Sequence, residues 1–300
     1  MVDITHKSNT LREAIAKANV KVSKPETILA VKQNTVPKGN VIEVARTAGL
    51  FGVKKTAELI PDCHPLPVEY TKIDFEVKEM EVEISIHVKT IYKTGVEVEA
   101  MHGASIVALT MYDMLKPIDK GVSIQNIRLE KKKGGKSDFG KTNLELNAAV
   151  IVCSDSVSAG KKQDKAGLII KEKLESQNIK INHYQVIPDK IDVIQETLKA
   201  NLSNDLVIFT GGTGMSPNDV TPEAILPLIE RPVKGIEEAI RKYGQERTPY
   251  AMLSRSVAGF IGNTLVLSLP GSSNGAKESI DAVFPAIKHV FKVLNAEFKH

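Results

Sequence analysis

The chain has 300 residues, which is long enough for two domains with separate hydrophobic cores. No apolar run approaches the roughly 20 residues of a membrane span, the N-terminus lacks an apolar signal core, and a net charge of +4 is too small to indicate a nucleic-acid partner. Cys63 and Cys153 are the only cysteines, which excludes a disulfide scaffold, a zinc ribbon and an iron–sulfur cluster. We therefore expect a cytoplasmic protein that binds anionic small molecules, with no membrane and no nucleic acid as partner.

Residues 1–130 predict helices mixed with paired antiparallel strands. Asn9-Thr10 favours a helix cap, because apolar residues follow at helical spacing at positions 11, 14, 15 and 18. Alternating apolar residues at 82, 84, 86 and 88 predict a half-buried strand, with a partner strand at 73–77. The other expected elements are helices at 41–59 and 99–116 and a strand at 122–129. Together they imply an α+β sandwich.

Residues 131–146 read as an exposed linker, because the stretch is charged, rich in Gly and Lys, and has no hydrophobic period. The GGKS within it is not a P-loop, since Glu130 stands where the first glycine is required. A solvated lysine cluster is the ordinary interpretation, although Lys132 or Lys136 could reach a phosphate group nearby. A nucleic-acid-binding linker would depend on these lysines alone.

Residues 147–300 follow a βαβα rhythm, which predicts a three-layer α/β domain with a mostly parallel sheet. The expected strands are 148–153, 181–187, 206–209 and 264–269, and the expected helices are 164–175 and 192–202. In such sheets, ligands bind beyond the carboxyl ends of the strands. Polar loops follow these strand ends: Ser154-Asp155-Ser156, Asp189, the glycine-rich loop with Asp219, and Pro270-Gly271-Ser272-Ser273.

The most informative of these loops is TGGTG at 210–214, which follows a buried strand and precedes a helix expected to begin at Thr221. Glycines let backbone N–H groups approach an anion, and a helix N-terminus adds partial positive charge. Thr210, Thr213 and Ser216 supply hydroxyl donors, and Asp219 is a possible Mg²⁺ ligand. A plain tight turn is the alternative interpretation. Convergence of four polar loops on one edge favours a site.

Three arrangements in the first half could carry chemistry. Glu97 and Glu99, if extended, would lie side by side on one face. Asp113 and Lys116 are neighbours at i, i+3 on the expected helix, and His64 lies in a rigid turn between two prolines. Solvated carboxylates, a surface ion pair and a satisfied turn histidine are the ordinary alternatives. However, acid, base and lysine together are what a proton-shuttling rearrangement of a phosphorylated substrate requires.

The blocks AGLFGVKKTAELIPDCHPL, TGVEVEAMHGASIVALTMYDMLK and IRLEKKKGGKS make residues 1–138 resemble the cyclic pyranopterin monophosphate synthases of molybdenum cofactor biosynthesis. The resemblance implies ferredoxin-like protomers, with the active site between subunits of a hexamer. It implies that cyclised reduced GTP (3',8-cyclo-7,8-dihydro-GTP) is converted to cyclic pyranopterin monophosphate and diphosphate, with no cofactor.

The same resemblance implies roles for individual residues. Its catalytic positions fall on Asp113, Lys116, Lys38, His64, Glu97 and Glu99. Its substrate contacts fall on Asp62, Cys63, His64, Val98 and Glu99, to which Lys132 and Lys136 are added as candidate phosphate contacts. The family's GGKSG ends here with Asp138 instead of glycine.

The blocks VCSDSVSAG, QDKAG, VIPD, TGGTGMSPNDVTPEA, LSR and LPGS make the second half resemble the molybdopterin adenylyltransferases, which have the molybdopterin-binding fold. The resemblance implies that MgATP adenylates molybdopterin. Asp189 and Asp219 would be catalytic and bind Mg²⁺, and the substrate-binding residues would be Ser154, Asp155, Gly211, Gly212, Thr213, Gly214 and Ser272.

The two resemblances together predict a bifunctional enzyme that acts on pterins and nucleotides and forms a homo-oligomer, a trimer or a hexamer. For the second half, a non-catalytic module that binds a pterin or nucleotide and organises an oligomer stays open as the alternative.

Overall fold

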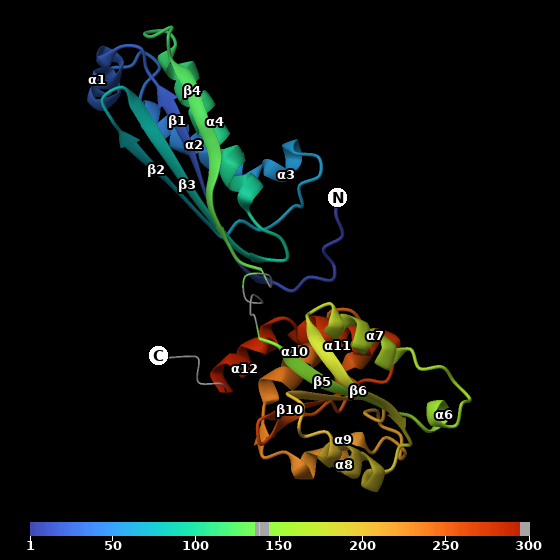
Figure 1. The fold of residues 1–300 in the computed structure, drawn as a ribbon. Coiled ribbons are helices and arrows are strands. Elements are labelled where there is room, and N and C mark those ends of the chain that lie inside the picture. Colours follow the sequence, from blue (N-terminus) through green and yellow to red (C-terminus); the bar gives the residue numbers. More distant parts are fainter. Residues whose placement is uncertain (136–137, 139–143, 295–300) are drawn as a thin grey trace. The chain divides into compact units, whose positions relative to one another are not determined.

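The computed structural model describes residues 1–135, 138 and 144–294, so the predicted contact Lys136 lies outside the described residues. The chain divides into two compact units, Met1–Asp138 and Phe139–His300 (Figure 1). Within the described residues, none of the helices combines the length and apolar character that crossing a bilayer requires. Each unit has a hydrophobic core of its own.

The first unit is a four-stranded antiparallel sheet with helices packed on it. Its elements are β1 (Thr10–Lys21), α1 (Pro25–Gln33), α2 (Val41–Lys54), α3 (Thr56–Leu59), β2 (Tyr70–Val77), β3 (Glu81–Tyr92), α4 (Glu97–Leu115) and β4 (Ser123–Lys133). The strand order is β2-β3-β1-β4, and every neighbouring pair is antiparallel. The predicted pairing of 73–77 with 82–88 is confirmed, with Ile73 opposite Ile86. Strand β4 extends to Lys133, into the stretch expected to be a linker.

The helix expected after Asn9-Thr10 is wrong, because Thr10 begins strand β1. Burial along β1 alternates with a period of two, and its buried side chains are Ala14, Ala16, Ala18 and Val20. Leu11, which the helical interpretation placed on the buried face, is 50% exposed. Pairing with β3 along its whole length overrides the helical preference of alanine, and the small side chains let α4 pack closely on the strand.

Helices α2 and α4 approach each other closely because glycines stand where they cross. A Cβ atom at Gly49 would lie 2.3 Å from Cγ2 of Val107, and one at Gly103 would lie 2.5 Å from Cγ2 of Val53. Any larger residue at either position would push the helices apart. The position of α4, which carries Glu97 and Glu99 at one end and Asp113 at the other, is therefore fixed by α2 and the sheet.

The second unit is a three-layer α/β domain. Its main elements are β5 (Leu146–Cys153), α6 (Asp155–Ser158), α7 (Ala166–Glu175), β6 (Ile179–Ile187), α8 (Ile191–Ala200), β7 (Leu206–Thr210), α9 (Thr221–Ile225), β8 (Arg231–Pro232), α10 (Lys234–Gln245), η2 (Pro249–Leu253), β9 (Ala258–Ile261), β10 (Thr264–Leu269), α11 (Ser273–Val283) and α12 (His289–Leu294). Successive residues of β5 alternate between two cores, since Val150 packs with α7, α10 and α11 whereas Ile151 packs with α8 and α9. Figure 1 shows these helices on opposite faces of the sheet.

The sheet of the second unit is mixed, with the order β6-β5-β7-β10-β9-β8. The four strands predicted from the sequence, β5, β6, β7 and β10, are parallel, whereas β9 and β8 form an antiparallel edge that was not predicted. Because parallel strands end at the same edge of a sheet, the loops after β5, β6, β7 and β10 leave the sheet side by side.

Candidate functional site

An aspartate between two lysines lies at the C-terminal end of α4. One carboxylate oxygen of Asp113 lies 2.6 Å from Nζ of Lys38, and the other lies 2.8 Å from Nζ of Lys116. Lys38 comes from the loop before α2 and also donates to the main-chain carbonyl of Asp113 at 2.9 Å. Hydrogen bonds from Lys116 and then Lys38 lower the pKa of Asp113 to about 2. At neutral pH the cluster is therefore a carboxylate flanked by two ammonium groups, all open to solvent.

A second cluster lies at the N-terminal end of α4. The sequence suggested that Glu97 and Glu99 lie side by side on an extended segment. Instead, both occupy the first turn of the helix, where their side chains point in different directions. Glu99 is buried and accepts a hydrogen bond from Sγ of Cys63 at 3.2 Å, whereas Glu97 pairs with Lys132 at 3.4 Å. Carboxylates in a first helical turn are favourable because they face the positive end of the helix dipole.

Burial dominates the titration of this second cluster. It raises the pKa of Glu99, with the charge of Glu97 adding to the effect. Burial, followed by the hydrogen bond and charge of Glu99, raises the pKa of Cys63 to about 12. Cys63 is therefore a neutral thiol that donates to Glu99, and neither group has the protonation behaviour of an exposed side chain.

The N-terminal residues lie against the loop that carries His64. Nε2 of His64 lies 2.8 Å from the carbonyl oxygen of Val2, and the terminal ammonium lies 3.0 Å from Asp62. Since a carbonyl only accepts, Nε2 of His64 carries a proton in this contact. Val98, the remaining predicted contact, is 44% exposed on the surface of α4.

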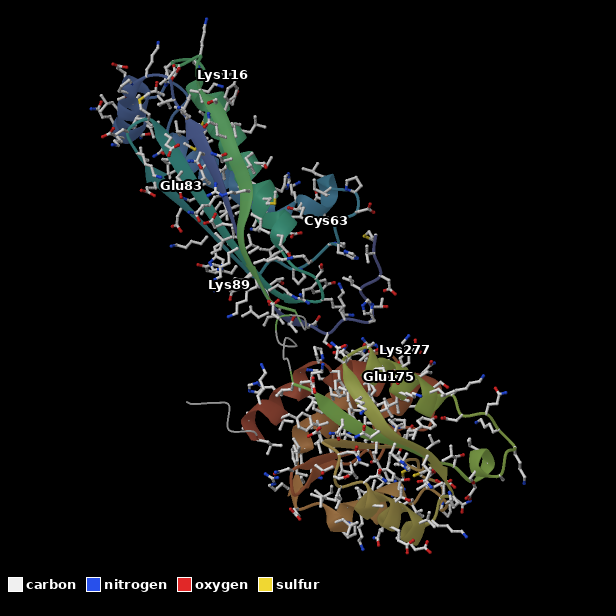
Figure 2. The ribbon with its side chains drawn as sticks, viewed as in Figure 1. Cys63, Glu83, Lys89, Lys116, Glu175 and Lys277 are labelled. Carbon is white, nitrogen blue, oxygen red and sulfur yellow. The ribbon has the colours of Figure 1, made fainter. Side chains whose placement is uncertain are left out.

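The two clusters are far apart within one copy of the chain. Glu97 and Asp113 are sixteen positions apart on one straight helix, which corresponds to about 24 Å. Figure 2 shows Lys116 and Cys63 toward opposite ends of α4. The structure therefore brings the predicted residues together as two groups, but does not bring the two groups to one place.

In the second unit, the loops expected at the carboxyl ends of the parallel strands do line a common cavity. This first cavity has a volume of about 470 Å³. Its predicted lining residues are Ser154, Asp189, Gly211, Gly212, Asp219 and Ser272. Lys162, Asp164 and Lys165 also line the cavity. No role was predicted for these three residues, although Asp164 and Lys165 belong to the QDKAG block.

The glycine-rich loop passes very close to its neighbours. Gly211 and Gly212 have φ angles of +104° and +60°, which favour glycine. A Cβ atom at Gly211 would lie 2.1 Å from the carbonyl oxygen of Cys153, and one at Gly212 would lie 2.9 Å from Oδ1 of Asp189. Thr213 and Gly214, which were expected to bind substrate, are not among the described residues that line the cavity, and their carbonyls accept from Arg255.

Of the predicted carboxylates, Asp189 and Asp219 line the first cavity, whereas Asp155, which was expected to bind substrate, is not among the described residues that line it and contacts Asp189 instead. Asp155 and Asp189 bond reciprocally, since the main-chain N–H of each donates to the carboxylate of the other at 3.0 and 3.1 Å. Oδ1 of Asp189 is buried and has no hydrogen-bond partner in the part of the chain that the structure describes. Burial, and then the charges of Asp155 and Asp219, raise the pKa of Asp189. An orphaned carboxylate oxygen in a negative environment is a favourable position for a cation.

Asp189 and Asp219 offer too few ligands to hold a metal ion by themselves, but they suit Mg²⁺, which takes its other ligands from a phosphate and water. Among the described residues, there is no group of three His, Cys, Asp or Glu side chains placed to hold a metal ion. Mg²⁺ usually takes one or two carboxylates and completes its octahedron with phosphate oxygens and water. Asp189 and Asp219 therefore fit an Mg²⁺ ion that enters with a phosphorylated ligand.

A second cavity of about 580 Å³ adjoins the first and shares Ser272 and Ser273 with it. It lies between α10, η2 and the start of α11, and its polar lining includes Arg241, Thr248, Tyr250, Ser254 and Asn274. No sequence motif predicted this cavity, although residues of the LSR and LPGS blocks, Ser254, Pro270 and Ser272, line it.

The family described as "MoaC family" matches residues 1–135, and the one described as "Probable molybdopterin binding domain" matches residues 149–289. A "Molybdenum cofactor biosynthesis bifunctional protein" of Chlorobaculum tepidum is 38% identical over 299 residues, which covers 99% of this chain and 95% of that protein. A "Cyclic pyranopterin monophosphate synthase" of Clostridium botulinum is 50% identical over 142 residues, which covers 46% of this chain and 89% of that protein. Among solved structures, the molybdopterin biosynthesis enzyme MoaB of Thermus thermophilus matches with 38% sequence identity and a TM-score of 0.48. The match covers 50% of this chain and 97% of the MoaB chain.

The contact between Cys63 and Glu99 predicts how fast the thiol is alkylated. Glu99→Gln removes the charge that raises the pKa of Cys63, weakens the hydrogen bond that also raises it, and leaves burial, so the thiolate fraction should increase and iodoacetamide at pH 8 should react about three to ten times faster. Mass spectrometry follows each thiol separately, with buried Cys153 as the internal reference. Glu97→Gln is the matched control and should change the rate much less, because Glu97 is not among the causes that raise the pKa of Cys63. Equal rates in wild type and Glu99→Gln would contradict the contact.

Proposed function

Because this chain belongs to the family of bifunctional molybdenum cofactor biosynthesis proteins, we propose that each of its two units catalyses its own step of that pathway. We assign the first step to residues 1–130 and the second to residues 147–300, with 131–146 between them. The first step is that of a cyclic pyranopterin monophosphate synthase, and the second is the adenylation of molybdopterin.

In the first step, cyclised reduced GTP is converted to cyclic pyranopterin monophosphate with release of diphosphate. The observation that carries this proposal is the Asp113 carboxylate held between Lys38 and Lys116. The two ammonium groups can neutralise the phosphate oxygens as the bond to diphosphate breaks, and Asp113, which its low pKa keeps ionised, can hold both lysines in position for this task. We expect this step to use charge stabilisation by these side chains and no cofactor.

We further propose that each active site for the first step is formed by residues from two copies of the chain. The cluster around Asp113 and the cluster around Glu99 are about 24 Å apart on α4, too far for one small substrate. An antiparallel arrangement about a two-fold axis would place the Asp113 end of one copy beside the His64 end of its partner.

The outer surface of the first unit supports such packing. Val98, Met101 and Leu109 are exposed at helical spacing along α4, and Val44 and Phe51 are exposed on α2 beside it. Exposed apolar side chains aligned on two packed helices suit a subunit contact. The strand order β4-β1-β3-β2 and the two helices α2 and α4 support assigning the unit to the ferredoxin-like sandwiches.

In the second step, the terminal phosphate of molybdopterin attacks the α-phosphorus of ATP, and diphosphate leaves. The observation that carries this proposal is the first cavity, where Asp189 and Asp219 meet the glycine-rich loop. Mg²⁺ bound by these aspartates would neutralise charge on the phosphates. The pterin would occupy the second cavity, with its phosphate near Ser272 and Ser273, which both cavities share.

A pterin- or nucleotide-binding module without catalysis is the second candidate for this unit. It is favoured by the description of the matching family, which names molybdopterin binding and no transfer reaction. Turnover by the wild-type chain distinguishes the two candidates.

Asp113→Ala and Lys116→Ala should each reduce formation of cyclic pyranopterin monophosphate by at least about 100-fold while the melting temperature changes little, because both side chains are half exposed. The double variant should be little worse than either single variant if the pair acts as a unit. Glu58→Ala, which breaks another exposed i, i+3 pair with Lys55, is the control and should keep activity. Activity within a few-fold of wild type in either variant would reject the assignment.

Asp219→Asn should reduce Mg²⁺-dependent formation of adenylated molybdopterin by orders of magnitude, because the amide cannot neutralise the metal. Molybdopterin binding should persist, since the amide keeps an oxygen that can accept from the N–H of Ser216. Exposed Asp192→Asn is the control. Undiminished turnover in the variant would remove Asp219 from the mechanism. Binding without turnover in the wild type would favour the non-catalytic module.

A further inference from the structure

Arg255 joins both ends of the loop 211–220, which connects β7 to α9. Its Nε donates to the carbonyl oxygen of Gly214 at 2.8 Å, and its Nη2 donates to the carbonyl oxygen of Asp219 at 2.5 Å. Its Nη1 forms an ion pair with Glu223 in the first turn of α9. The main-chain N–H of Arg255 also donates to the carbonyl of Thr213 at 3.0 Å. A single arginine therefore contacts the start, the end and the helix that follows the loop.

The conformation of this loop determines where the Asp219 carboxylate lies. Oδ2 of Asp219 accepts from the N–H of Ser216 at 2.8 Å, and the N–H of Asp219 donates to the carbonyl of Ser216 at 2.9 Å. These are short-range contacts within an exposed turn, so on their own they leave the turn free to move as a whole. The contacts from Arg255 connect that turn to the chain that precedes β9.

Arg255 itself is not among the described residues that line either cavity, and its side chain is about one-third exposed. It is therefore placed to act through the loop and not on a bound ligand. The planar guanidinium suits this task because its fixed fork of donors can reach two carbonyls and a carboxylate at once. A lysine would keep the charge but could not hold all three groups.

We propose that Arg255 is a positioning residue that fixes the loop 211–220 and thereby holds the Asp219 carboxylate at the first cavity. This inference rests on the proposed function of the second unit for its catalytic consequence, but not for its structural one. The alternative is that Arg255 only contributes to the stability of the unit. If Arg255 positions the loop, loss of the guanidinium should affect only the loop 211–220. If Arg255 only stabilises the unit, the loss should affect the whole unit.

Hydrogen exchange of the full chain tests the structural part. In Arg255→Lys, amides of the loop 211–220 should exchange about ten times faster while those of β5 and β7 keep their rates. The control is Arg231→Lys, since Arg231 also donates to a loop carbonyl, that of Gly262, but is not among the described residues that line the first cavity. Unchanged loop exchange, or faster exchange throughout the unit, would overturn the proposal. Glu223→Gln, which removes the charge that pairs with Nη1 of Arg255, should give a smaller change in the same direction.

Kinetics tests the functional part. In Arg255→Lys, kcat for adenylation should fall at least about 30-fold while KM for molybdopterin changes less than about threefold, because the pterin site is untouched. A loosened loop with normal kcat would overturn the positioning role. If the wild type forms no adenylate, the proposed function fails and Mg²⁺-dependent binding of a non-hydrolysable ATP analogue replaces kcat. That binding should then weaken about tenfold in Arg255→Lys but not in Arg231→Lys, and equal binding would overturn the inference.

Discussion

Helix α4 imposes the constraint on which the first unit depends. Its 19 residues form a rod of about 28 Å, and the close crossing at Gly49 and Gly103 fixes it against α2. The rod carries a carboxylate between lysines at one end and a buried carboxylate with a thiol at the other. Because a helix cannot bend back on itself, the two groups can cooperate on one substrate only if a second copy of the chain supplies one of them.

In the second unit, the candidate residues come from different loops but lie close together. Its parallel strands end at one edge, so Asp189 and Asp219 meet around one cavity although they lie on different loops. The glycine-rich loop can pass this closely over Cys153 and Asp189 only because no Cβ intervenes. The described residues of one chain therefore bring both aspartates and the glycine-rich loop to one cavity.

The sequence predicted features that follow from local periodicity, and failed where distant contacts decide. Buried strands ending in polar loops identified the parallel sheet and the residues at its edge, because strand ends and turn residues are encoded locally. The strand β1 was mistaken for a helix, since alanine favours helices and only pairing with β3 reveals its period. The contact of Lys38 with Asp113 joins residues 75 positions apart, and the second cavity is lined by residues of α10, η2 and α11. Neither feature can be predicted from a local sequence pattern.

Mixing two inactive chains tests the shared first site most directly. Asp113→Ala and His64→Ala chains, unfolded and refolded together, should recover about one quarter of wild-type cyclic pyranopterin monophosphate synthase activity, because half the dimers are mixed and each has one intact site. A mixture of Asp113→Ala with Lys116→Ala should recover none, since both changes affect the same end of α4. Absence of recovery in the first mixture, with subunit mixing verified by mass spectrometry, would contradict a site built from two copies.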